Sequence, residues 1–249
     1  MTIIKSAEEI AIMRQAGRIV AIVLQRMSEA VKPGLKTRQL DEIAVKELGK
    51  WDTARASFKG YRGYPASVCV SVNDEVVHGI PGKRILKEGD IVSLDFGVIY
   101  KGFQGDAAVT VGVGNVGPEA RKLMEVTRES LAEGINAACE GGFLGNIGAA
   151  IQGYVESKGF SVVREYSGHG IGRDMHEDPL VPNFGVKLEG LKLKEGMTMA
   201  LEPMVNRGGW KTRVGANGWT VHTADSSLSA HFEHTIAIRS NETEILTVL

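Results

Sequence analysis

The spacing of apolar residues changes from helical to β-type twice along the chain, and this order limits the folds open to it. Residues 7–30 carry apolar side chains at helical spacing, a second such segment follows, and residues 67–113 hold short β-branched runs between Gly, Pro, Asn and Asp. Two further helical segments and then more strands complete the chain. We therefore predict an α+β fold in one domain, residues 1–249, with two similar halves of about 1–115 and 116–249.

Start and stop signals define the first two helices. Ser6 followed three positions later by Glu9 is a capping box, so we expect a helix from about Ala7 to Ala30. Pro33-Gly34 ends this helix, and Thr37 is the expected N-cap of the second one.

Similar signals occur in the second half. Pro118 suits the first turn of a third helix that runs to about Cys139, where Gly141-Gly142 breaks it. Asn146 is the expected cap of a fourth helix that stops at Gly159. The strands expected after it are 160–164, 197–205, 219–222, 231–238 and 243–248.

Composition excludes several classes of protein. Hydrophobic residues make up 43% and charged residues 24%, which is typical of a globular chain. The 29 basic and 30 acidic side chains leave a net charge of -1, so no nucleic acid or anionic membrane partner is expected. No run is long enough to span a membrane and the amino terminus does not read as a signal peptide. Cys69 and Cys139 make no disulfide framework, which favours a reducing, cytoplasmic location.

Two aspartates flank a hairpin signal. Asp95 and Asp106 lie in consecutive β runs, with Tyr100-Lys101-Gly102 midway between them. If the aspartates are directly opposed, the turn closes at Tyr100 and Lys101 and the carboxylates share one face, roughly 5 Å apart at Cβ. The alternative is that both are turn or edge residues beside glycine. A carboxylate buried in the first of these runs would need a cation.

Three other residues could complete such a site. Glycines around His169 let the backbone approach a ligand closely, and Glu202 and Glu233 interrupt β runs that are otherwise apolar or small. Taken singly, each has a plainer explanation, because a glutamate at a strand end is usually a surface residue and a glycine-flanked histidine is usually a turn residue. Together with Asp95 and Asp106 they predict a metal site.

Short motifs surround all of these residues. They are 94–97 (Leu-Asp-Phe-Gly), 105–106 (Gly-Asp), 168–172 (Gly-His-Gly-Ile-Gly), 176–179 (His-Glu-Asp-Pro), 201–204 (Leu-Glu-Pro-Met), 232–235 (Phe-Glu-His-Thr) and the run 70–81. In order and spacing they resemble those of type I methionine aminopeptidases. The resemblance implies the pita-bread fold, in which two pseudo-symmetric halves with a curved antiparallel sheet and outer helices clasp a dinuclear metal site. It also implies removal of the initiator methionine from new proteins.

The resemblance assigns a role to each metal ligand. Asp95 would bind one ion, and His169 and Glu202 the other, whereas Asp106 and Glu233 would bridge both. Oxygen-rich ligation with one imidazole suits Mn(II), Fe(II), Co(II) or Zn(II). Paired ions of this kind, known in aminopeptidases, lower the pKa of a bridging water so that hydroxide is available near neutral pH.

The resemblance also implies the catalytic groups. Glu202 is the expected proton acceptor for the attacking water, His176 would act on the carbonyl oxygen, and His78 would act on the scissile amide and leaving group. Considered alone, either histidine reads as an ordinary structural residue.

A methionine side chain needs a narrow apolar pocket. The positions that the resemblance implies for it, besides His78 and His176, are Tyr61, Tyr64, Cys69, Met175, Met204 and Trp219. The plainer reading is that each is ordinary core. Two features depart from the family pattern: Met175 stands where an aromatic residue is usual, and Ser57-Phe58-Lys59 lacks the cysteine of some relatives.

The expected partners are the amino termini of peptides and nascent proteins, with a small second residue preferred. The chain starts directly at its first helix, without a Cys/His-rich extension, so we expect the short bacterial form. We also expect a monomer that associates transiently with the ribosome. Two alternatives stay open. One is a proline-specific aminopeptidase or dipeptidase of the same fold, and the other is a metal-free peptide-binding module on the same scaffold.

Overall fold

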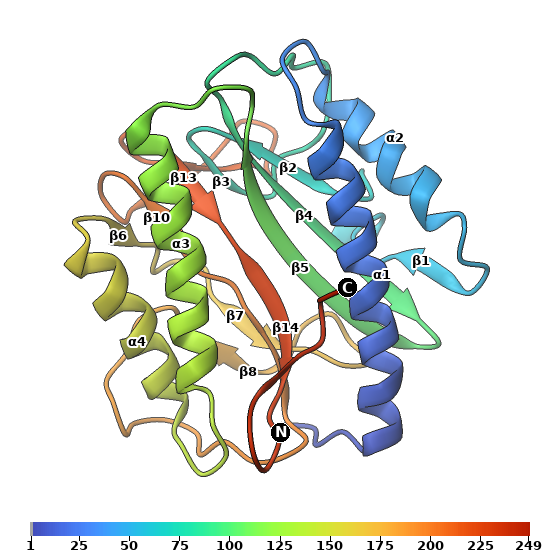
Figure 1. Ribbon diagram of the computed structural model, residues 1–249, viewed down its shortest axis with the longest axis vertical. Helices are drawn as coiled ribbons and strands as arrows, with labels where there is room; N and C mark the ends of the chain where they lie inside the picture. The colour runs from blue at the N-terminus through green and yellow to red at the C-terminus, as the bar shows by residue number, and fades with distance from the viewer. Residues whose placement is uncertain (1) are drawn as a thin grey trace.

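The computed structural model describes residues 2–249, in which antiparallel strands form three sheets (Figure 1). The large sheet has nine strands: β1 Ala54–Ala56, β2 Cys69–Val72, β4 Ile91–Tyr100, β5 Phe103–Gly112, β7 Gly168–Gly170, β8 Glu177–Val181, β9 Thr198–Leu201, β14 Glu233–Ala237 and β15 Glu244–Ile245. The two smaller sheets hold β6 Ser161–Val162, β10 Met204–Asn206 and β13 Ser229–His231, and β3 Glu75–Val77, β11 Thr212–Val214 and β12 Val221–Thr223.

The strand order of the large sheet joins both parts of the chain. It runs β1-β4-β5-β14-β9-β7-β8, with β2 paired to β4 and β15 paired to β14. The β5–β14 pair is therefore the seam between strands from the first half and strands from the second. Any site that needs residues from both halves is expected near this seam.

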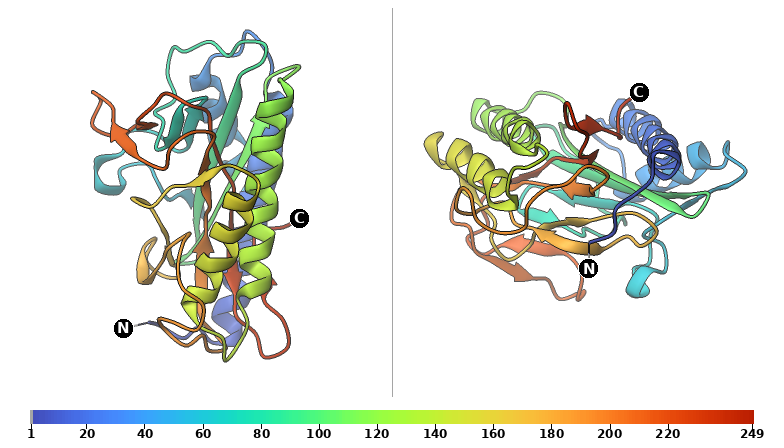
Figure 2. Two further views of the ribbon diagram at one scale, coloured as in Figure 1. Left: turned by 90° about the vertical axis from the view of Figure 1, so that its left-hand side faces the viewer. Right: turned by 90° about the horizontal axis from the view of Figure 1, so that it is seen from below.

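Four helices lie on one side of the large sheet, as the right-hand view in Figure 2 shows. They are α1 Ala7–Ala30, α2 Thr37–Leu48, α3 Pro118–Ala137 and α4 Leu144–Ser157, and Tyr61–Gly63 forms a short 3-10 turn. Each pair of helices buries its apolar face against a different part of the sheet. One core cluster joins α1 and α2 to β2 and β4, and another joins α3 and α4 to β9 and β14. No helix within residues 2–249 combines the length and the apolar character of a membrane span.

The predicted α+β class and all four predicted helices are confirmed, and the Ser6 capping box is present. Two predicted caps are wrong. Lys36 is the N-cap of α2, and the Thr37 hydroxyl instead accepts from the Gly82 amide at 2.8 Å. Asn146 lies inside α4 because its side chain accepts from the Leu188 amide at 2.8 Å. In both cases a backbone amide of a distant loop donates to the side chain that would otherwise cap the helix.

Several strands differ from the predicted pattern. β1, β7, β8 and β11 lie outside the predicted runs, because they are short and lack clear β-type alternation. Two runs predicted as single strands are each divided: β9 and β10 separate at Glu202-Pro203, and β13 and β14 separate at Phe232. These breaks occur at or next to predicted ligands, so they re-aim side chains that a continuous strand would hold at fixed spacing.

Candidate metal centre

The β4–β5 hairpin brings the two aspartates to one face, although not in the predicted register. Asp95 is opposite Ala108 and Asp106 is opposite Gly97, so the direct pairing of the aspartates is wrong by two residues. The turn falls at Lys101 and Gly102, which both have a positive φ and form a tight two-residue connection. A shift of two residues preserves the side-chain face, so the carboxylates still converge, diagonally rather than directly.

Three predicted ligands meet at the seam of the sheet. The ligand atoms of Asp106 on β5, His169 on β7 and Glu233 on β14 all lie within 4.8 Å of one another, and the three residues are buried. Neither half of the chain supplies all of them. This separation in the chain and convergence in space is typical of a site built for a ligand rather than of surface acids.

His169 has the tautomer that a metal ligand needs. Its Nδ1 lies 2.8 Å from the Gly170 carbonyl oxygen, which can only accept, so the ring proton is on Nδ1. The lone pair is then on Nε2, which lies 3.5 Å from Glu202 Oε1. A lone pair and a carboxylate oxygen that face each other in a buried site are stabilised by a cation between them.

Glu202 and Asp95 complete the predicted set. Glu202 follows β9 at the break before β10, where Asn183 Nδ2 donates to its backbone carbonyl at 3.0 Å. Asp95 lies in the middle of β4, opposite Cys69 on β2. Both side chains line the same cavity as the three ligands above. All five predicted metal ligands are therefore brought together.

The electrostatics of these carboxylates favour a bound cation. One oxygen each of Asp95, Asp106 and Glu233 is buried without a hydrogen-bond partner in the described chain. Burial raises the pKa of Asp95 to about 7. Burial and then repulsion by the neighbouring carboxylates raise the pKa of Asp106, Glu202 and Glu233 well above the usual values. Divalent cations would relieve both the missing partners and the repulsion, so the residues present fit a metal.

Two threonine hydroxyls hold the seam where the ladder ends. The β5–β14 ladder has only two backbone pairs, at Ala107 and Ala108 of β5. Beyond one end, Thr235 Oγ1 donates to the Asp106 carbonyl at 2.7 Å and accepts from its amide at 3.0 Å. Beyond the other end, Thr110 Oγ1 donates to the His231 carbonyl at 2.7 Å and accepts from the His231 amide at 2.9 Å. Hydrogen bonds from side chains thus replace backbone hydrogen bonds next to the predicted ligands.

A cavity of about 160 Å³ opens over the carboxylates. It is lined by Phe58, Tyr61, Arg62, Tyr64, Cys69, His78, Asp95, Asp106, His169, His176, Glu202, Trp219 and Glu233. Rigid packing shapes its apolar wall. The Tyr64 hydroxyl lies 2.8 Å from the Gly79 carbonyl oxygen, to which it donates, and 3.1 Å from the Val68 carbonyl oxygen. The Tyr64 and Trp219 rings meet edge-on at 5.2 Å.

His176 and His78 stand on this wall. The Tyr61 hydroxyl lies 2.8 Å from His176 Nδ1, and burial together with His169 lowers the pKa of His176 to about 3. Burial also lowers the pKa of His78, whose backbone has a φ of 59°. The next residue is Gly79, where a side chain would collide with the Val70 carbonyl. This strained turn fixes where the His78 imidazole lies.

The two methionines predicted for the pocket lie beside it. Met175 packs with Phe58 and Tyr61 in one buried cluster, and Met204 packs with Val77 in another. Neither is among the residues that line the cavity. Their predicted contact with substrate stays a prediction.

Residues missed by the sequence analysis include Phe58 and Arg62, which line the cavity, and His231, whose Nε2 lies 3.8 Å from Glu202 Oε2. The strand period of two was an available signal for His231, because it stands two positions before Glu233. Arg62 carries no comparable signal. It takes a positive φ in the turn that follows Gly60.

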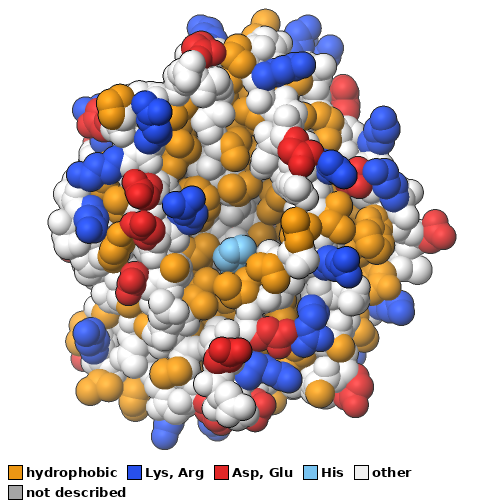
Figure 3. Space-filling model, viewed as in Figure 1, with side chains coloured by type: hydrophobic (Ala, Val, Ile, Leu, Met, Phe, Trp, Pro, Cys, Tyr) orange, Lys and Arg blue, Asp and Glu red, His pale blue; other side chains and the backbone are white. Residues whose placement is uncertain are grey.

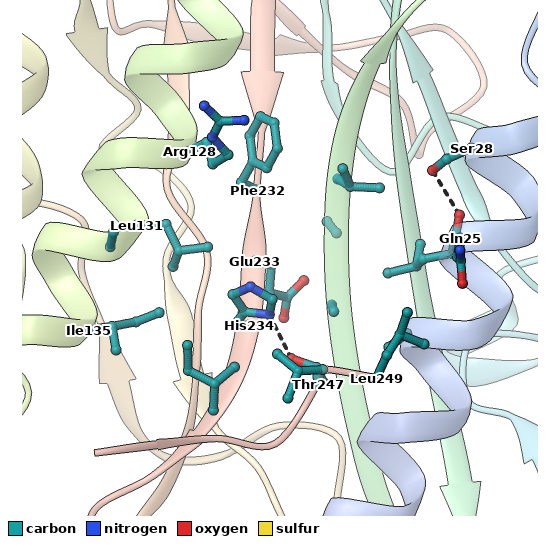
Figure 4. Close-up of a pocket in the computed structure, with 18 of the residues that line it drawn as sticks. Gln25, Ser28, Arg128, Leu131, Ile135, Phe232, Glu233, His234, Thr247 and Leu249 are labelled. Carbon is teal, nitrogen blue, oxygen red and sulfur yellow. Dashed lines mark hydrogen bonds between the residues drawn. The ribbon is translucent and has the colours of Figure 1, made fainter. Parts of the chain in front are cut away.

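A larger hollow, of about 720 Å³, lies on the helix side of the sheet between α1 and α3 (Figures 3 and 4). Its lining is mostly apolar, and His234 points into it, with His234 Nδ1 2.8 Å from Thr247 Oγ1. Glu233 and His234 are neighbours on β14, so their side chains leave opposite faces of the sheet. The ligand cluster therefore belongs to the smaller cavity on the other face.

Comparison with known proteins agrees with this geometry. The model of metallopeptidase family M24 matches residues 11–240. The chain belongs to this family. Methionine aminopeptidase 1 of Bacillus subtilis is 51% identical over 247 residues, 99% of each chain, and a methionine aminopeptidase of Clostridium acetobutylicum is 52% identical over 249 residues, 100% of this chain and 99% of the relative. The resemblance seen in the motifs is thereby confirmed, and membership of M24 implies the use of divalent metal.

Solved structures confirm the pita-bread fold. The crystal structure of a methionine aminopeptidase from Thermotoga maritima superposes with a TM-score of 0.98, at 46% identity and full coverage of both chains. The Xaa-Pro dipeptidase of Bacillus anthracis has a TM-score of 0.78 at 23% identity, and the match covers 98% of this chain and 61% of that one. The second likeness shows the fold alone.

Proposed function

We propose that this protein removes the amino-terminal methionine from peptides and new proteins as a methionine aminopeptidase with two divalent metal ions. The observation that carries the proposal is the convergence of Asp106, His169 and Glu233 within 4.8 Å beneath a cavity that Asp95 and Glu202 also line. Relatives of the same length at about half identity carry that name. The division of the domain into two halves near residue 115 is part of the same proposal.

The five ligands divide between two ion positions in the proposal. Asp106 and Glu233 would be shared by both ions, Asp95 would hold one of them, and His169 with Glu202 would hold the other. The ions, drawn from Mn(II), Fe(II), Co(II) or Zn(II), would supply a water of lowered pKa and polarise the scissile carbonyl. Four carboxylates balance the charge of two divalent ions, which favours a pair over a single ion.

The residues of the chain then carry the proton transfers. Glu202 accepts a proton from the attacking water. His176 is neutral at working pH, and when the Tyr61 hydroxyl donates to Nδ1 its proton lies on Nε2, from which it donates to the carbonyl oxygen. His78 donates a hydrogen bond toward the nitrogen of the leaving group, and that nitrogen takes up the proton that Glu202 accepted from the water.

The cavity wall supplies selectivity for methionine. Tyr61, Tyr64, Cys69 and Trp219 line it, and burial raises the pKa of the Cys69 thiol, so this side chain acts as a neutral apolar group. A flexible thioether packs well against aromatic rings and sulfur. We also propose a preference for a small second residue, action as a monomer in the cytoplasm, and transient contact with the ribosome.

Two measurements test the proposal. Purified protein is analysed for bound metal, and its activity is compared on Met-Ala-Ser and Ala-Pro peptides. Cleavage of Met-Ala-Ser with about two equivalents of metal per chain supports it. Cleavage confined to Ala-Pro peptides would favour the proline-specific alternative, and folded protein that binds no metal would favour the peptide-binding module.

A further inference from the structure

A buried histidine next to the metal centre lacks a hydrogen-bond partner. His231 on β13 is 2% exposed, and its Nε2 makes no hydrogen bond within the described chain. Leaving a buried polar atom unpaired costs free energy, so such atoms usually have a reason to be there. The nearest acceptor in an ion-pair geometry is Glu202 Oε2, at 3.8 Å.

The Glu202 carboxylate lies between two imidazoles that differ in their protons. Oε1 faces His169 Nε2 at 3.5 Å, and Oε2 faces His231 Nε2 at 3.8 Å. The Gly170 carbonyl holds the His169 proton on Nδ1, so that ring offers Glu202 a lone pair. Within the described residues no carbonyl holds the His231 proton on Nδ1, so the His231 ring is free to offer N–H from Nε2.

The backbone of His231 is anchored independently of the metal ligands. The Thr110 hydroxyl donates to the His231 carbonyl, accepts from its amide, and lies 2.8 Å from Ser93 Oγ. His231 is also paired with Met204 in the small sheet. The backbone of His231 is therefore held at a fixed place, and a shift of less than about 1 Å by the longer Glu202 side chain would bring Nε2 and Oε2 within hydrogen-bond distance.

We propose that His231 is a positioning residue that donates a hydrogen bond from Nε2 to Glu202 Oε2. This bond fixes the carboxylate, so that Oε1 is turned toward His169 and the cavity. The inference rests on the proposed function, in which Glu202 is the proton acceptor. It assigns His231 no contact with substrate.

Two variants test whether His231 acts as a hydrogen-bond donor or only fills space. His231→Gln keeps an N–H donor of similar reach, whereas His231→Leu fills a similar volume without one. His231→Leu should lower kcat about 10–100-fold, the usual effect of losing a partner that orients a ligand, with little change in KM. His231→Gln should retain most of the wild-type kcat. Thermal unfolding of His231→Leu should not occur earlier than in wild type, because the variant buries no unpaired nitrogen.

A second readout is independent of turnover. Isothermal titration of the apo proteins with Mn(II) should show weaker binding to His231→Leu than to His231→Gln, since Glu202 is less well oriented. His222→Leu, a partly buried histidine that contacts Asp74 away from the cluster, serves as the matched control and should bind Mn(II) as wild type does.

Three outcomes would overturn the inference: wild-type kcat in His231→Leu, equal loss in the Gln and Leu variants, or loss of kcat that simply follows loss of thermal stability. These outcomes are distinct from failure of the proposed function. In that case wild-type protein itself would fail to bind Mn(II) or to cleave Met-Ala-Ser.

Discussion

At the scale of single residues, the chemistry of the centre depends on which atoms are left without partners. Buried carboxylate oxygens of Asp95, Asp106 and Glu233 have none in the described chain, and the Nε2 lone pair of His169 faces a carboxylate. Each of these features is unfavourable in isolation. All of them become favourable together when cations are bound. Removal of one ligand should therefore stabilise the metal-free protein and destabilise the metal-loaded protein.

Glu233→Ala should abolish metal binding and activity together, because in the proposed centre this carboxylate is shared by both ions. The same change should raise the thermal midpoint of the apo protein, since the remaining buried carboxylates repel each other less. Metal content by mass spectrometry, peptide cleavage and apo melting curves measure the three effects. Glu29→Ala, on the exposed face of α1, is the control. Activity in a verified metal-free Glu233→Ala protein would rule out the mechanism.

His78→Ala should keep the metal and slow turnover. The imidazole lines the cavity, and no ligand atom depends on it, so metal content should equal that of wild type while kcat falls about 10²–10⁴-fold, the usual contribution of a positioned proton donor. The strained turn at φ 59° is retained in the variant. Loss of metal in His78→Ala would show instead that the residue supports the centre.

At the scale of elements, short turns and strand ends aim the catalytic groups. The turn after His169 carries His176, and a buried ion pair between Lys5 and Glu177 supports it. Glu177 Oε1 also accepts from the Arg173 amide at 2.9 Å. Lys5 in the amino-terminal segment thereby supports the turn that carries His176, although the two are far apart in the chain.

Lys5→Met should therefore reduce both stability and turnover. Breaking one side of a buried pair typically costs about 3–5 kcal/mol, because the remaining charge is left without a partner. Urea unfolding measures the stability, and kcat on Met-Ala-Ser reports the placement of His176. The double variant Lys5→Met/Glu177→Gln should recover part of the stability. A Lys5→Met protein as stable and active as wild type would show that the turn holds without this ion pair.

The end of the β5–β14 ladder offers a second prediction at this scale. Thr235→Val removes the hydroxyl that bonds both backbone groups of Asp106, so Asp106 and Glu233 should be less well fixed relative to each other. Mn(II) affinity measured by calorimetry should fall, by about 10–100-fold if the effect resembles that of other partners of ligands. Thr235→Ser, which keeps the hydroxyl, should restore it. Equal affinity in Val and Ser variants would contradict the role.

At the scale of the whole molecule, folding and metal binding are coupled through the seam between the two parts of the sheet. Ligands from β5, β7 and β14 can meet only in the folded chain. Metal bound to the native state alone stabilises it by mass action. Chelation should therefore lower the thermal midpoint.

The stability of the metal-free protein should fall as pH rises above about 7. Burial raises the folded-state pKa of Asp95 to about 7, from an ordinary value of 3.8, and the pKa values of Asp106, Glu202 and Glu233 are also raised. At these carboxyl groups the native state binds more protons than the unfolded state, so the stability that Asp95 contributes is fully present below pH 3.8 and falls as pH rises toward 7. Burial lowers the pKa of the histidines from 6.5, which has the opposite effect on stability below that pH; they are His78, His169, His176, His231 and His234. Above about pH 7 the carboxyl groups therefore decide the sign.

Melting curves of chelated protein between about pH 7 and 9 would measure this dependence, with metal-loaded protein as the control. The apo midpoint should fall with rising pH, and the gap between apo and loaded protein should widen, because deprotonated carboxylates bind metal more tightly. An apo midpoint that rises steadily over this range would show that the carboxylates are not buried as described.

The sequence by itself determined the features that depend on neighbours in the chain. The capping box and periodicity placed α1 from Ala7 to Ala30, and the strand period of two put Asp95 and Asp106 on one face even though their register was predicted two residues out. Local conformational preference is enough for these two conclusions. The five proposed ligands were found because the motifs that hold them are short local strings that resemble those of a known family.

Only the tertiary structure decided which distant groups touch. The caps predicted at Thr37 and Asn146 failed because loops far along the chain compete for those side chains. The same holds for the hairpin register, for the separation of Met175 and Met204 from the cavity lining, and for the position of His231 beside Glu202. Such contacts are set by how helices and strands from both parts of the chain pack together, and no short stretch of sequence carries that information.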